Sequence, residues 1–431
     1  MRPAISSVET SSNLPSSTTV IIIGGGIVGL TAALTLAERK IPVVVLEKGQ
    51  IAGEQSSRNL GWIRKTSRTS EDVPLAQASD RLWKEMSRRV QGDVGYRQSG
   101  IMFVTRTQEQ MASYEKWYES VRHLDLDTQI LSNHQISSLA PQGKTKWEGG
   151  VYTPSDGCAE PTLAASAIAK AAIEKGAIII ESCAVRTLSL SAGRVSGVVT
   201  EQGEIRCEQV LLTGGLWSRK FLGNLDINFP TLPLICSVLH TKPMQGPTDI
   251  SLGAPDFSFR RHQDGGFIIT QRGALDAPMT LDHLLIGMRY LNQLRAQGGF
   301  LRVSLGKYGL TDLALSRRWK RDHISPFEKI RIMDPQANIR LNKEAINNLQ
   351  HAWPMFSALK IANAWAGVID VTPDSNPIIG SIDKIHGLFV ASGFSGHGFG
   401  TSPAAGQLAA DLIMGNTPII DPTPYSFRRF Q

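Results

Sequence analysis

The sequence has few cysteines, and those it has are far apart. Cys158, Cys183, Cys207 and Cys236 are separated by at least 24 positions, and no CxxC pair occurs. This spacing excludes the disulfide-rich scaffolds of small secreted proteins and the paired thiolates of a structural zinc site. We therefore expect buried thiols in a reducing compartment such as the cytoplasm, and no bound metal.

Long apolar runs and strong compositional bias are also absent. No stretch reaches the roughly 18 uncharged apolar residues that a membrane-spanning helix needs. Glycine (40) and proline (22) are near average usage, which excludes collagen-like and low-complexity chains. With 42% hydrophobic and 19% charged residues, a disordered chain is excluded too. At about 150 residues per domain, the length of 431 residues predicts two or three domains.

Acidic residues are fewer than basic ones, 38 against 45, which gives a formal net charge of +7. This balance favours an anionic cofactor, an anionic membrane surface or nucleic acid. The basic residues are mostly dispersed and no nucleic-acid motif is present, so we exclude nucleic acid. One local cluster, residues 317–321 (RRWKR), indicates either a solvated helix end or a contact with an anionic membrane or a partner subunit.

The first 18 residues lack the features of a folded element. Residues 1–19 contain nine serines or threonines and one basic residue, Arg2. A secretory signal would need a charged start and an apolar stretch, and neither is present. We expect a disordered leader over residues 1–18, with order beginning at Thr19.

A glycine-rich turn follows the first predicted strand. Residues 20–23 (VIII) are all β-branched, which predicts a buried strand. Residues 24–29 (GGGIVG) form the turn, and residues 30–38 are predicted to continue as a helix. Gly24 permits the tight turn, Gly26 lets the backbone approach a pyrophosphate, and Gly29 allows close helix–strand packing. A second strand, residues 43–46, ends at Glu47, 18 residues beyond Gly29, where a carboxylate can accept hydrogen bonds from a ribose. This order predicts a dinucleotide site at a helix N-terminus.

The glycine turn alone does not distinguish NAD from FAD, but the polar loop after the second strand does. Residues 53–62 (GEQSSRNLGW) can place serine hydroxyls and backbone N–H groups along a pyrophosphate and a flavin ring. The alternative is a plain solvent loop.

A second glycine-rich region lies near the end of the chain. Residues 365–380 lead into a strand at 388–391 and the sequence GFSGHGFG at 393–400. A helix is predicted from Ala404 to Met414, with Ser402 as N-cap and Pro403 at its first position. Its N-terminus would stabilise the negative charge of a reduced flavin by about 0.3–1 kcal/mol, or up to about 2 kcal/mol when partly buried. The first turn would hold the ADP half of FAD and this one the isoalloxazine half.

A third strand, residues 210–213, also ends in glycines, at Gly214 and Gly215. Before it we predict a helix over 161–175, a strand over 177–185 and a β-ribbon with turns at 191–193 and 201–203. Pieces of one nucleotide-binding domain are therefore spread over the whole chain.

Together these motifs resemble the D-amino acid oxidase (DAO) superfamily of FAD-dependent oxidoreductases. The resemblance covers about residues 19–415 and rests on the two terminal glycine motifs and on TGGLWS at 213–218. Residues 56–59 and 365–380 look most like bacterial D-amino acid dehydrogenase and glycine oxidase-like proteins.

The resemblance implies an α/β fold in which a Rossmann-like FAD-binding domain is interleaved with an antiparallel-sheet (α+β) substrate domain. We assign residues 19–75, 155–220 and 360–431 to the first and residues 76–154 and 221–359 to the second. For the second domain we predict strands at 96–105, 149–152 and 232–241, a hairpin of 257–261 with 267–271, and helices at 281–297 and 342–359. The predicted cofactor-binding residues are Gly24, Gly26, Ile27, Val28, Gly29, Glu47, Lys48, Ser56, Ser57, Arg58, Asn59, Gly61, Val185, Gly214, Trp217, Gly393, Gly396, His397 and Gly398.

The resemblance also implies oxidation of a carbon–nitrogen bond, with hydride transfer to flavin N5 and hydrolysis of the resulting imine. His397 is expected beside the flavin ring, in contact with flavin or substrate. Many relatives carry an arginine for the substrate carboxylate where this chain has Asp370, so the clamp is expected elsewhere. Arg260 is the first replacement candidate, followed by Arg64 and Arg272. Asp370 itself would face a cationic amine or cap local backbone.

Flavin is expected to be non-covalent. Gly367 stands where sarcosine-oxidase relatives attach flavin through cysteine, and Gly400 stands where they carry a lysine. Two alternatives remain: an FAD-dependent 2-hydroxy-acid oxidoreductase, and a non-catalytic flavoprotein subunit of a larger complex. A cytoplasmic location is expected. The sequence leaves open whether the protein contacts the inner membrane or a quinone, and whether it forms an oligomer.

Overall fold

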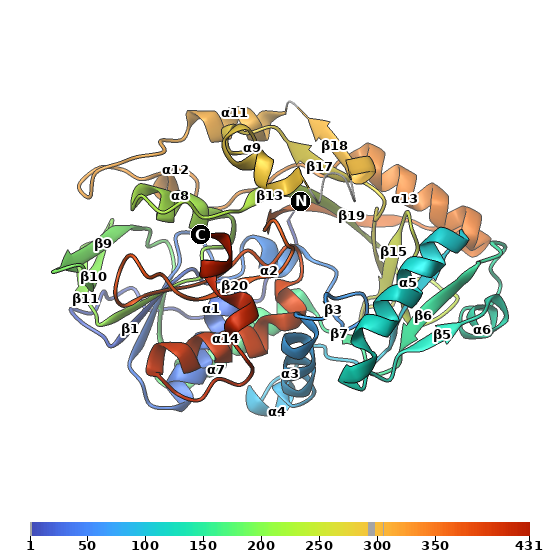
Figure 1. Cartoon of the computed structure of the whole chain (residues 1–431), viewed down its shortest axis with the longest axis horizontal. Helices are drawn as coiled ribbons and strands as arrows, with labels where there is room; N and C mark the ends of the chain where they lie inside the picture. Colours follow the sequence, from blue (N-terminus) through green and yellow to red (C-terminus); the bar gives the residue numbers. More distant parts are fainter. Residues whose placement is uncertain (1, 292–297, 305) are drawn as a thin grey trace.

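Two sheets organise the computed structural model, which describes residues 2–291, 298–304 and 306–431. A six-stranded sheet with its helices occupies the left of Figure 1, and a ten-stranded sheet extends through the right. Both the helices and the mixed sheets agree with the α/β fold class expected from the sequence.

The six-stranded sheet has the order β20-β21-β12-β1-β2-β8. All neighbours are parallel except β20, which is antiparallel to β21. Its strands are β1 (Val20–Ile23), β2 (Val43–Leu46), β8 (Ile178–Ile180), β12 (Gln209–Leu212), β20 (Ile378–Ser381) and β21 (Leu388–Ser392).

Both faces of this sheet are covered, which explains why β1 is apolar throughout. Val20 and Ile22 pack in the core formed with helices α1 (Ile27–Glu38), α7 (Pro161–Glu174) and α14 (Gly398–Met414). Ile21 points to the opposite core, formed with the three-stranded sheet of β9 (Val185–Ser191), β10 (Arg194–Thr200) and β11 (Glu204–Arg206). The glycine turn after β1 therefore leaves the sheet from a fixed, fully buried strand.

The ten-stranded sheet has the order β18-β17-β13-β16-β15-β14-β4-β6-β5, with β19 on the other side of β13. Its pairs are antiparallel except β14–β4 and β17–β18, which are parallel. The strands are β4 (Ile101–Thr105), β5 (Gln129–Leu131), β6 (Gly149–Thr153), β13 (Leu232–Thr241), β14 (Ser251–Gly253), β15 (Ser258–Arg261), β16 (Phe267–Thr270), β17 (Leu275–Pro278), β18 (Leu301–Ser304) and β19 (Ile361–Val371).

The remaining elements cover the second sheet and connect the two. α13 contributes Leu349 and Ala352 to an aromatic core with Phe257, Phe259 and Trp353. The other helices and strands are α2 (Gln55–Arg58), α3 (Val73–Lys84), α4 (Met86–Arg89), α5 (Gln108–Val121), α6 (Asn133–Leu139), α8 (Ser218–Asn224), α9 (Leu281–Ile286), α11 (Lys307–Ala314), α12 (Pro326–Lys329), α13 (Ile339–Ala352), β3 (Trp62–Ile63) and β7 (Gly157–Cys158). Within the described residues, no helix combines the length and the apolar character needed to cross a bilayer.

Several predicted elements differ from the structure at their ends. The strand predicted over 96–105 begins at Ile101, and the helix predicted over 342–359 is α13, which begins at Ile339 and ends at Ala352. Of the helix predicted over 281–297, α9 covers residues 281–286, a 3-10 turn covers 287–290, and residues 292–297 lie outside the described residues. β19 falls in the range assigned to the FAD domain but pairs along its length with β13, so it belongs to the ten-stranded sheet.

The helix near the C-terminus begins earlier than predicted, at Gly398 rather than near Ser402, and Pro403 lies inside it. A proline has no N–H, so the carbonyl of Phe399 loses its usual partner four residues later. The Ser402 hydroxyl donates to that carbonyl at 2.8 Å instead. The helix N-terminus is thereby moved directly onto the Gly396–Gly398 segment.

The disordered leader expected over residues 1–18 is not what the structure has for residues 2–18. This segment lies against the core formed by the six-stranded sheet with α1, α7 and α14, where Ile5 and Val8 are partly buried. It is held by backbone bonds from Ser11 N–H to the Ile179 carbonyl (2.9 Å) and from Thr18 N–H to the Arg206 carbonyl (3.0 Å). The few apolar side chains among the serines and threonines are enough to hold this extended segment against the folded part of the chain.

Candidate active site

A cavity of about 430 Å³ is lined by residues of both sheets. Its lining includes the turn after β1, the segment around α2, the end of β12 and the residues that precede α14. On the other side it includes residues of β15 and β16 and the two residues that follow β16, Gln271 and Arg272. Cavities of this size accommodate large organic ligands.

The first glycine turn is tight enough to require its glycines. Gly24 has φ +114°, and a Cβ there would lie 2.6 Å from the carbonyl oxygen of Thr213. At Gly29, a Cβ would lie 2.3 Å from the carbonyl oxygen of Gly24. Gly26 is the N-cap of α1 and faces the cavity. The free N–H groups at this helix start make an anion site of the kind that binds pyrophosphate.

Glu47 fixes the same turn from the end of β2. Its carboxylate accepts from the Gly25 N–H at 2.8 Å and from the Gly49 N–H at 2.7 Å. Burial raises the pKa of Glu47, although Lys48 and the two backbone donors oppose the shift. The carboxylate lines the cavity with lone pairs left for hydroxyl groups. The ribose-binding role predicted for Glu47 stays a prediction.

The residues next to Glu47 form a network that the sequence did not indicate. Lys48 Nζ lies 2.9 Å from Glu54 Oε1 and 4.3 Å from the centre of the Trp217 ring. It also donates to the Arg331 carbonyl at 2.7 Å. Arg331 lies in a segment distant in sequence, so no local pattern could have placed it in the cavity lining.

The loop around α2 closes over the first turn. Ser56 Oγ accepts from the Ile27 N–H at 2.9 Å, at the start of α1. Arg58 is buried, and its guanidinium donates to Asp334 at 2.7 Å and to the Gly53 carbonyl at 2.9 Å. Asn59 accepts from the Gly61 N–H at 2.8 Å and so shapes the turn. Ser57 lies outside the cavity lining and points back into the loop, with its hydroxyl 3.4 Å from the Glu54 carbonyl.

Asp370, on β19, acts on the backbone of the second glycine segment. Its carboxylate accepts from the Gly393 N–H at 2.7 Å, and its carbonyl accepts from the Ser395 N–H at 3.0 Å. The side chain is 2% exposed. Burial raises the pKa of Asp370 to about 6, against the opposing effect of hydrogen bonds from Gly393 and Gln55. Of the two roles predicted for Asp370, the contacts match the backbone cap.

Asp370 should make stability depend on pH. Because its pKa is higher in the folded chain than in the unfolded one, its ionisation opposes folding as pH rises. The shift from 3.8 to about 6 corresponds to about 3 kcal/mol lost between about pH 4 and pH 7. Asp370→Asn keeps an acceptor for Gly393 without ionising, so the variant should not show this loss. Thermal unfolding of both proteins across this range measures it.

The control for this prediction is Asp249→Asn, which changes an aspartate that is 81% exposed. That variant should follow the pH dependence of the parent. Parallel unfolding curves for the parent and Asp370→Asn would contradict the prediction.

Arg64 and His397 meet at the other end of the cavity. Arg64 Nη2 lies 3.1 Å from His397 Nε2. Since arginine only donates, Nε2 accepts and the ring proton sits on Nδ1. Burial, with Arg68 and Arg64 nearby, lowers the pKa of His397 well below its usual value, so the ring is neutral. Burial and repulsion from Arg68 and Arg272 lower the pKa of Arg64 to about 9.

Arg272 extends the cationic wall of the cavity. Its guanidinium lies 4.3 Å from the centre of the Phe103 ring and donates to the Tyr114 hydroxyl at 3.1 Å. Within the described parts of the chain, neither Arg64 nor Arg272 forms an ion pair with a carboxylate, whereas Arg68 pairs with Asp72 at 2.8 Å. The guanidinium groups of Arg64 and Arg272 are therefore available to pair with an anionic group of a ligand.

Arg260, the first candidate for the substrate carboxylate, lies outside the cavity lining. Its guanidinium forms a bidentate pair with Glu160 at 2.8 and 2.7 Å and also donates to the Leu60 carbonyl. Both side chains of the pair are 1% exposed. Arg260 thus joins the ten-stranded sheet to the segment before α7, and its donors have no access to a ligand.

Most of the residues predicted from the sequence meet in this one cavity. Those in its lining are Gly24, Gly26, Ile27, Val28, Glu47, Lys48, Ser56, Arg58, Asn59, Gly61, Val185, Gly214, Trp217, Asp370, Gly396, His397 and Gly398. Gly29, Ser57, Gly393 and Arg260 are not among them. Gly29 and Gly393 shape the backbone beside it. Gln271 and Arg331 line the cavity without having been predicted.

Comparison with known proteins identifies a single family over most of the chain. The family model described as "DAO: FAD dependent oxidoreductase" matches residues 19–412.

Two curated relatives differ in how much of their own length is matched. Mitochondrial sarcosine dehydrogenase of Mus musculus is 24% identical over 97% of this chain, but the chain spans only 42% of that protein. Glycine oxidase of Geobacillus kaustophilus is 24% identical, with 95% of this chain and 96% of the relative covered.

A solved structure, L-amino acid deaminase from Proteus myxofaciens in complex with anthranilate, is similar over the whole chain. The sequences are 30% identical, the TM-score is 0.95, and 100% of this chain and 97% of that chain are covered. The arrangement of both sheets around the cavity is therefore shared with this neighbour.

Proposed function

Because this chain belongs to the DAO family of FAD-dependent oxidoreductases, we propose that it oxidises the carbon–nitrogen bond of an α-amino acid whose carboxylate is held by Arg64 and Arg272. The observation that carries the proposal is the pair of cavity arginines without a carboxylate partner among the described residues. They lie in the same cavity as the glycine turns that suit FAD.

The residues present fit FAD. At one end, Gly26 has no side chain and so leaves space for a ligand beside the start of α1. A Cβ on Gly26 would enter this space and lie 3.2 Å from Ser56 Oγ. At the other end, α14 begins at Gly398 beside the cavity. Trp62 Nε1 is buried without a hydrogen-bond partner in the described structure, although Trp62 lines the cavity. When bound, FAD supplies the two-electron oxidation.

Gly29→Ala should weaken FAD binding. The new Cβ would be forced within 2.3 Å of the Gly24 carbonyl oxygen. Overpacking of this kind costs about 1–3 kcal/mol, which is roughly 5- to 150-fold in FAD affinity if the strain falls on the binding-competent turn. The dissociation constant, measured by flavin fluorescence during titration of the apoprotein, tests this.

Gly223→Ala is the matched control, because a Cβ at Gly223 in α8 would have no heavy atom within 4 Å. Equal FAD affinity for both variants would contradict a packing role for Gly29.

The arginines also explain how the amine could lose its proton. Oxidation requires the neutral amine, because an ammonium has no lone pair to assist departure of the hydride. The positive charges that lower the pKa of Arg64 would also lower the pKa of a bound substrate ammonium. Among the described residues, Arg64, Arg68 and Arg272 would thus attract the substrate carboxylate and disfavour the protonated, cationic form of the substrate amine.

For the handedness of the substrate we propose the L-form. The relative that is 30% identical over the whole chain is an L-amino acid deaminase. The sequence resemblance to D-amino acid dehydrogenases makes the D-form the alternative, and the two are distinguished by direct comparison.

Anaerobic mixing of the holoenzyme with matched L- and D-amino acids, their decarboxylated amines and the corresponding 2-hydroxy acids tests the function. We expect L-amino acids to bleach the visible flavin absorbance and the decarboxylated amines to do so far more slowly. Reduction by the 2-hydroxy acid alone would establish the alternative hydroxy-acid oxidoreductase. Bleaching by none of these compounds would indicate a non-catalytic flavoprotein subunit. Admission of air after reduction shows whether oxygen accepts the electrons.

We further propose that the protein contacts the cytoplasmic surface of a membrane, where a quinone could accept electrons. The four free cysteines support a reducing compartment. The predicted basic cluster is largely paired within the chain: Arg317 with Asp282, Arg318 with Asp226, and Arg321 with Glu204.

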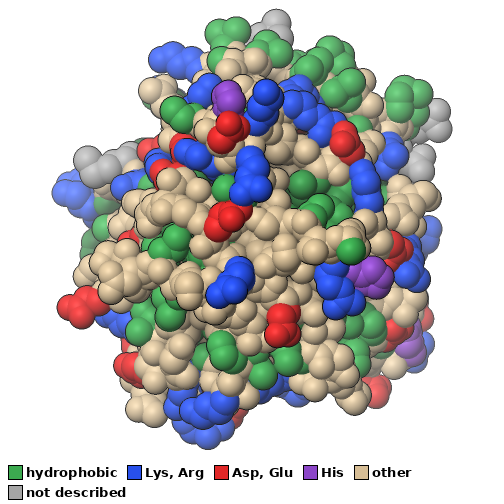
Figure 2. Space-filling model, turned by 90° about the vertical axis from the view of Figure 1, so that its left-hand side faces the viewer, with side chains coloured by type: hydrophobic (Ala, Val, Ile, Leu, Met, Phe, Trp, Pro, Cys, Tyr) green, Lys and Arg blue, Asp and Glu red, His purple; other side chains and the backbone are tan. Residues whose placement is uncertain are grey.

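An apolar surface nearby supports membrane contact better than that cluster does. Leu284 and Met288 are 72% and 75% exposed, and Leu310 and Leu313 on α11 are also exposed. Figure 2 shows hydrophobic side chains gathered along its upper edge, where α9 and α11 lie in Figure 1. Exposed apolar side chains in such number are typical of an interaction site. We expect co-sedimentation with anionic phospholipid vesicles, and its absence at low salt would contradict the membrane proposal.

A further inference from the structure

Three metal-ligating side chains meet outside the cavity, beside the hairpin of β15 and β16. They are His240, His262 and Asp264, and one ligand atom of each lies within 4.8 Å of the others. None of the three lines the cavity. Two imidazoles and a carboxylate are ligands typical of zinc and neighbouring divalent transition metals.

The sheet itself brings the three residues together. His240 lies near the end of β13, opposite Ile268 of β16. His262 and Asp264 belong to the turn between β15 and β16, which is closed by the His262 N–H donating to the Gly266 carbonyl at 2.8 Å. The turn is therefore folded back over the end of β13 by regular strand pairing.

The distances between ligand atoms already approach those around a bound metal. His240 Nε2 lies 3.2 Å from Asp264 Oδ2, and His262 Nδ1 lies 2.9 Å from Asp264 Oδ1. Four ligand atoms at about 2.0–2.1 Å from zinc in a tetrahedron lie about 3.4 Å from one another. The third pair of ligand atoms, from His240 and His262, also lies within 4.8 Å, so all three separations are near those around one ion.

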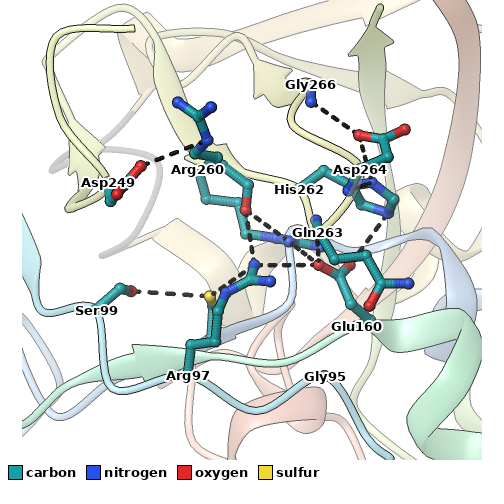
Figure 3. A network of polar contacts seen from close by, with 12 residues as sticks. Gly95, Arg97, Ser99, Glu160, Asp249, Arg260, His262, Gln263, Asp264 and Gly266 are labelled. Carbon is teal, nitrogen blue, oxygen red and sulfur yellow. Dashed lines mark hydrogen bonds and ion pairs between the residues drawn. The ribbon is translucent and has the colours of Figure 1, made fainter. Parts of the chain in front are cut away.

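A second carboxylate orients His262. Its Nε2 lies 3.3 Å from Glu160 Oε2, on the side of the ring away from Asp264. Figure 3 shows His262 between Glu160 and Asp264. An Nε2–H that donates to Glu160 leaves a lone pair on Nδ1, which accepts from the Asp264 N–H at 3.3 Å. A metal ion bound at Nδ1 would replace this hydrogen bond. A histidine whose other nitrogen donates to a carboxylate is the usual support of a metal ligand.

The surroundings leave room for an ion and a route to it. At Gly266, a Cβ would lie 3.0 Å from His240 Nε2 and 3.1 Å from Asp264 Oδ1, so glycine keeps this space open. The Asp264 side chain is 42% exposed, whereas those of His240 and His262 are 16% and 20% exposed.

We propose that His240, His262 and Asp264 bind a single divalent transition-metal ion of the zinc class, with a solvent molecule in the fourth position. The ion fastens the β15–β16 turn to β13. Through His262 and Glu160 it also supports the buried Glu160–Arg260 pair, which joins the ten-stranded sheet to the N-cap of α7. The site is structural, and this proposal does not depend on the proposed amino-acid oxidation.

The test uses tag-free holoenzyme that has been treated with a chelator and dialysed. Titration with zinc chloride in a calorimeter should give one ion per chain, and zinc should raise the unfolding temperature. Cu²⁺ at one equivalent should give an electron paramagnetic resonance spectrum with hyperfine coupling to two imidazole nitrogens. Hyperfine coupling to only one nitrogen, or to none, would overturn the proposal. This measurement uses the unmodified protein and needs no variant.

Variants then assign the ligands. His240→Ala, His262→Ala and Asp264→Asn should each weaken zinc binding by more than the roughly 10- to 100-fold typical of losing a group that only hydrogen-bonds to a metal ligand. His351→Ala removes an exposed histidine of α13 and should leave zinc affinity unchanged. Zinc affinity that falls in His351→Ala, or that is unchanged in both His240→Ala and His262→Ala, would overturn the proposal.

Discussion

Arg272→Met should lower kcat/KM for an α-amino acid by about 30- to 5,000-fold. Removing one partner of a buried, hydrogen-bonded charge pair costs about 2–5 kcal/mol, and the substrate carboxylate would be left facing the cavity without Arg272. The methionine preserves the unbranched side chain that lies over Phe103. Because the carboxylate is bound before and during the reaction, most of the loss should appear in KM.

The comparison that isolates the carboxylate uses two substrates and a matched arginine. Oxidation of a decarboxylated amine should fall far less in Arg272→Met than oxidation of the amino acid, because Arg272 acts on the amine only through the amine pKa. Arg106→Met is the control, since Arg106 also stacks on an aromatic ring, 5.2 Å from the centre of Trp147, but lies outside the cavity lining. It should leave kcat/KM within about threefold, which is less than 1 kcal/mol. Equal losses for the acid and the amine would contradict the proposed clamp.

Arg260→Met should destabilise the protein by about 3–5 kcal/mol. The Glu160 carboxylate is 1% exposed and would lose the bidentate partner that offsets its burial. Breaking a buried pair by removing one partner leaves an uncompensated charge, which is the source of this large effect. The free energy of unfolding from chemical denaturation, together with the apparent unfolding temperature, measures the change.

The neighbouring residue supplies the control for Arg260. Arg261 pairs with Asp249 at 3.4 Å, and that aspartate is 81% exposed, so Arg261→Met should cost at most about 1 kcal/mol. Amino-acid KM should change far less in Arg260→Met than in Arg272→Met. A stable Arg260→Met protein with a strongly raised KM would restore Arg260 to the substrate-binding role predicted from the sequence.

The fold was predictable from local patterns where those patterns have a single physical meaning. A β-branched run that ends in closely spaced glycines before a helix specifies a strand, a turn and a helix start, and β1 and α1 follow it closely. The strand predicted over 232–241 and the hairpin predicted from 257–261 and 267–271 are likewise present, as β13 and as β15 with β16. Pro403 misled the prediction because proline usually marks a first helical turn, and here a serine hydroxyl satisfies the carbonyl that it leaves free.

The candidate site was predictable for the cofactor and much less so for the substrate. Backbone geometry constrains the cofactor residues, so glycines mark them in sequence. The arginines considered for the substrate carboxylate carry no such mark: nothing in the local sequence distinguishes Arg64, Arg260 and Arg272, and only their tertiary partners separate them. Glu160, the bidentate partner of Arg260, comes from a segment 100 positions earlier in the chain, so no local pattern reveals that this arginine is structural.

The order of strands in the six-stranded sheet has a consequence for biogenesis. β1 and β2 are synthesised first, yet β20, β21 and α14 come from the last part of the chain, and α14 packs against α1. A growing polypeptide on the ribosome therefore cannot complete this sheet until residues 378–414 have been synthesised. Until then the apolar strands β1 and β2 lack part of their cover, and the cavity beside α14 cannot be complete.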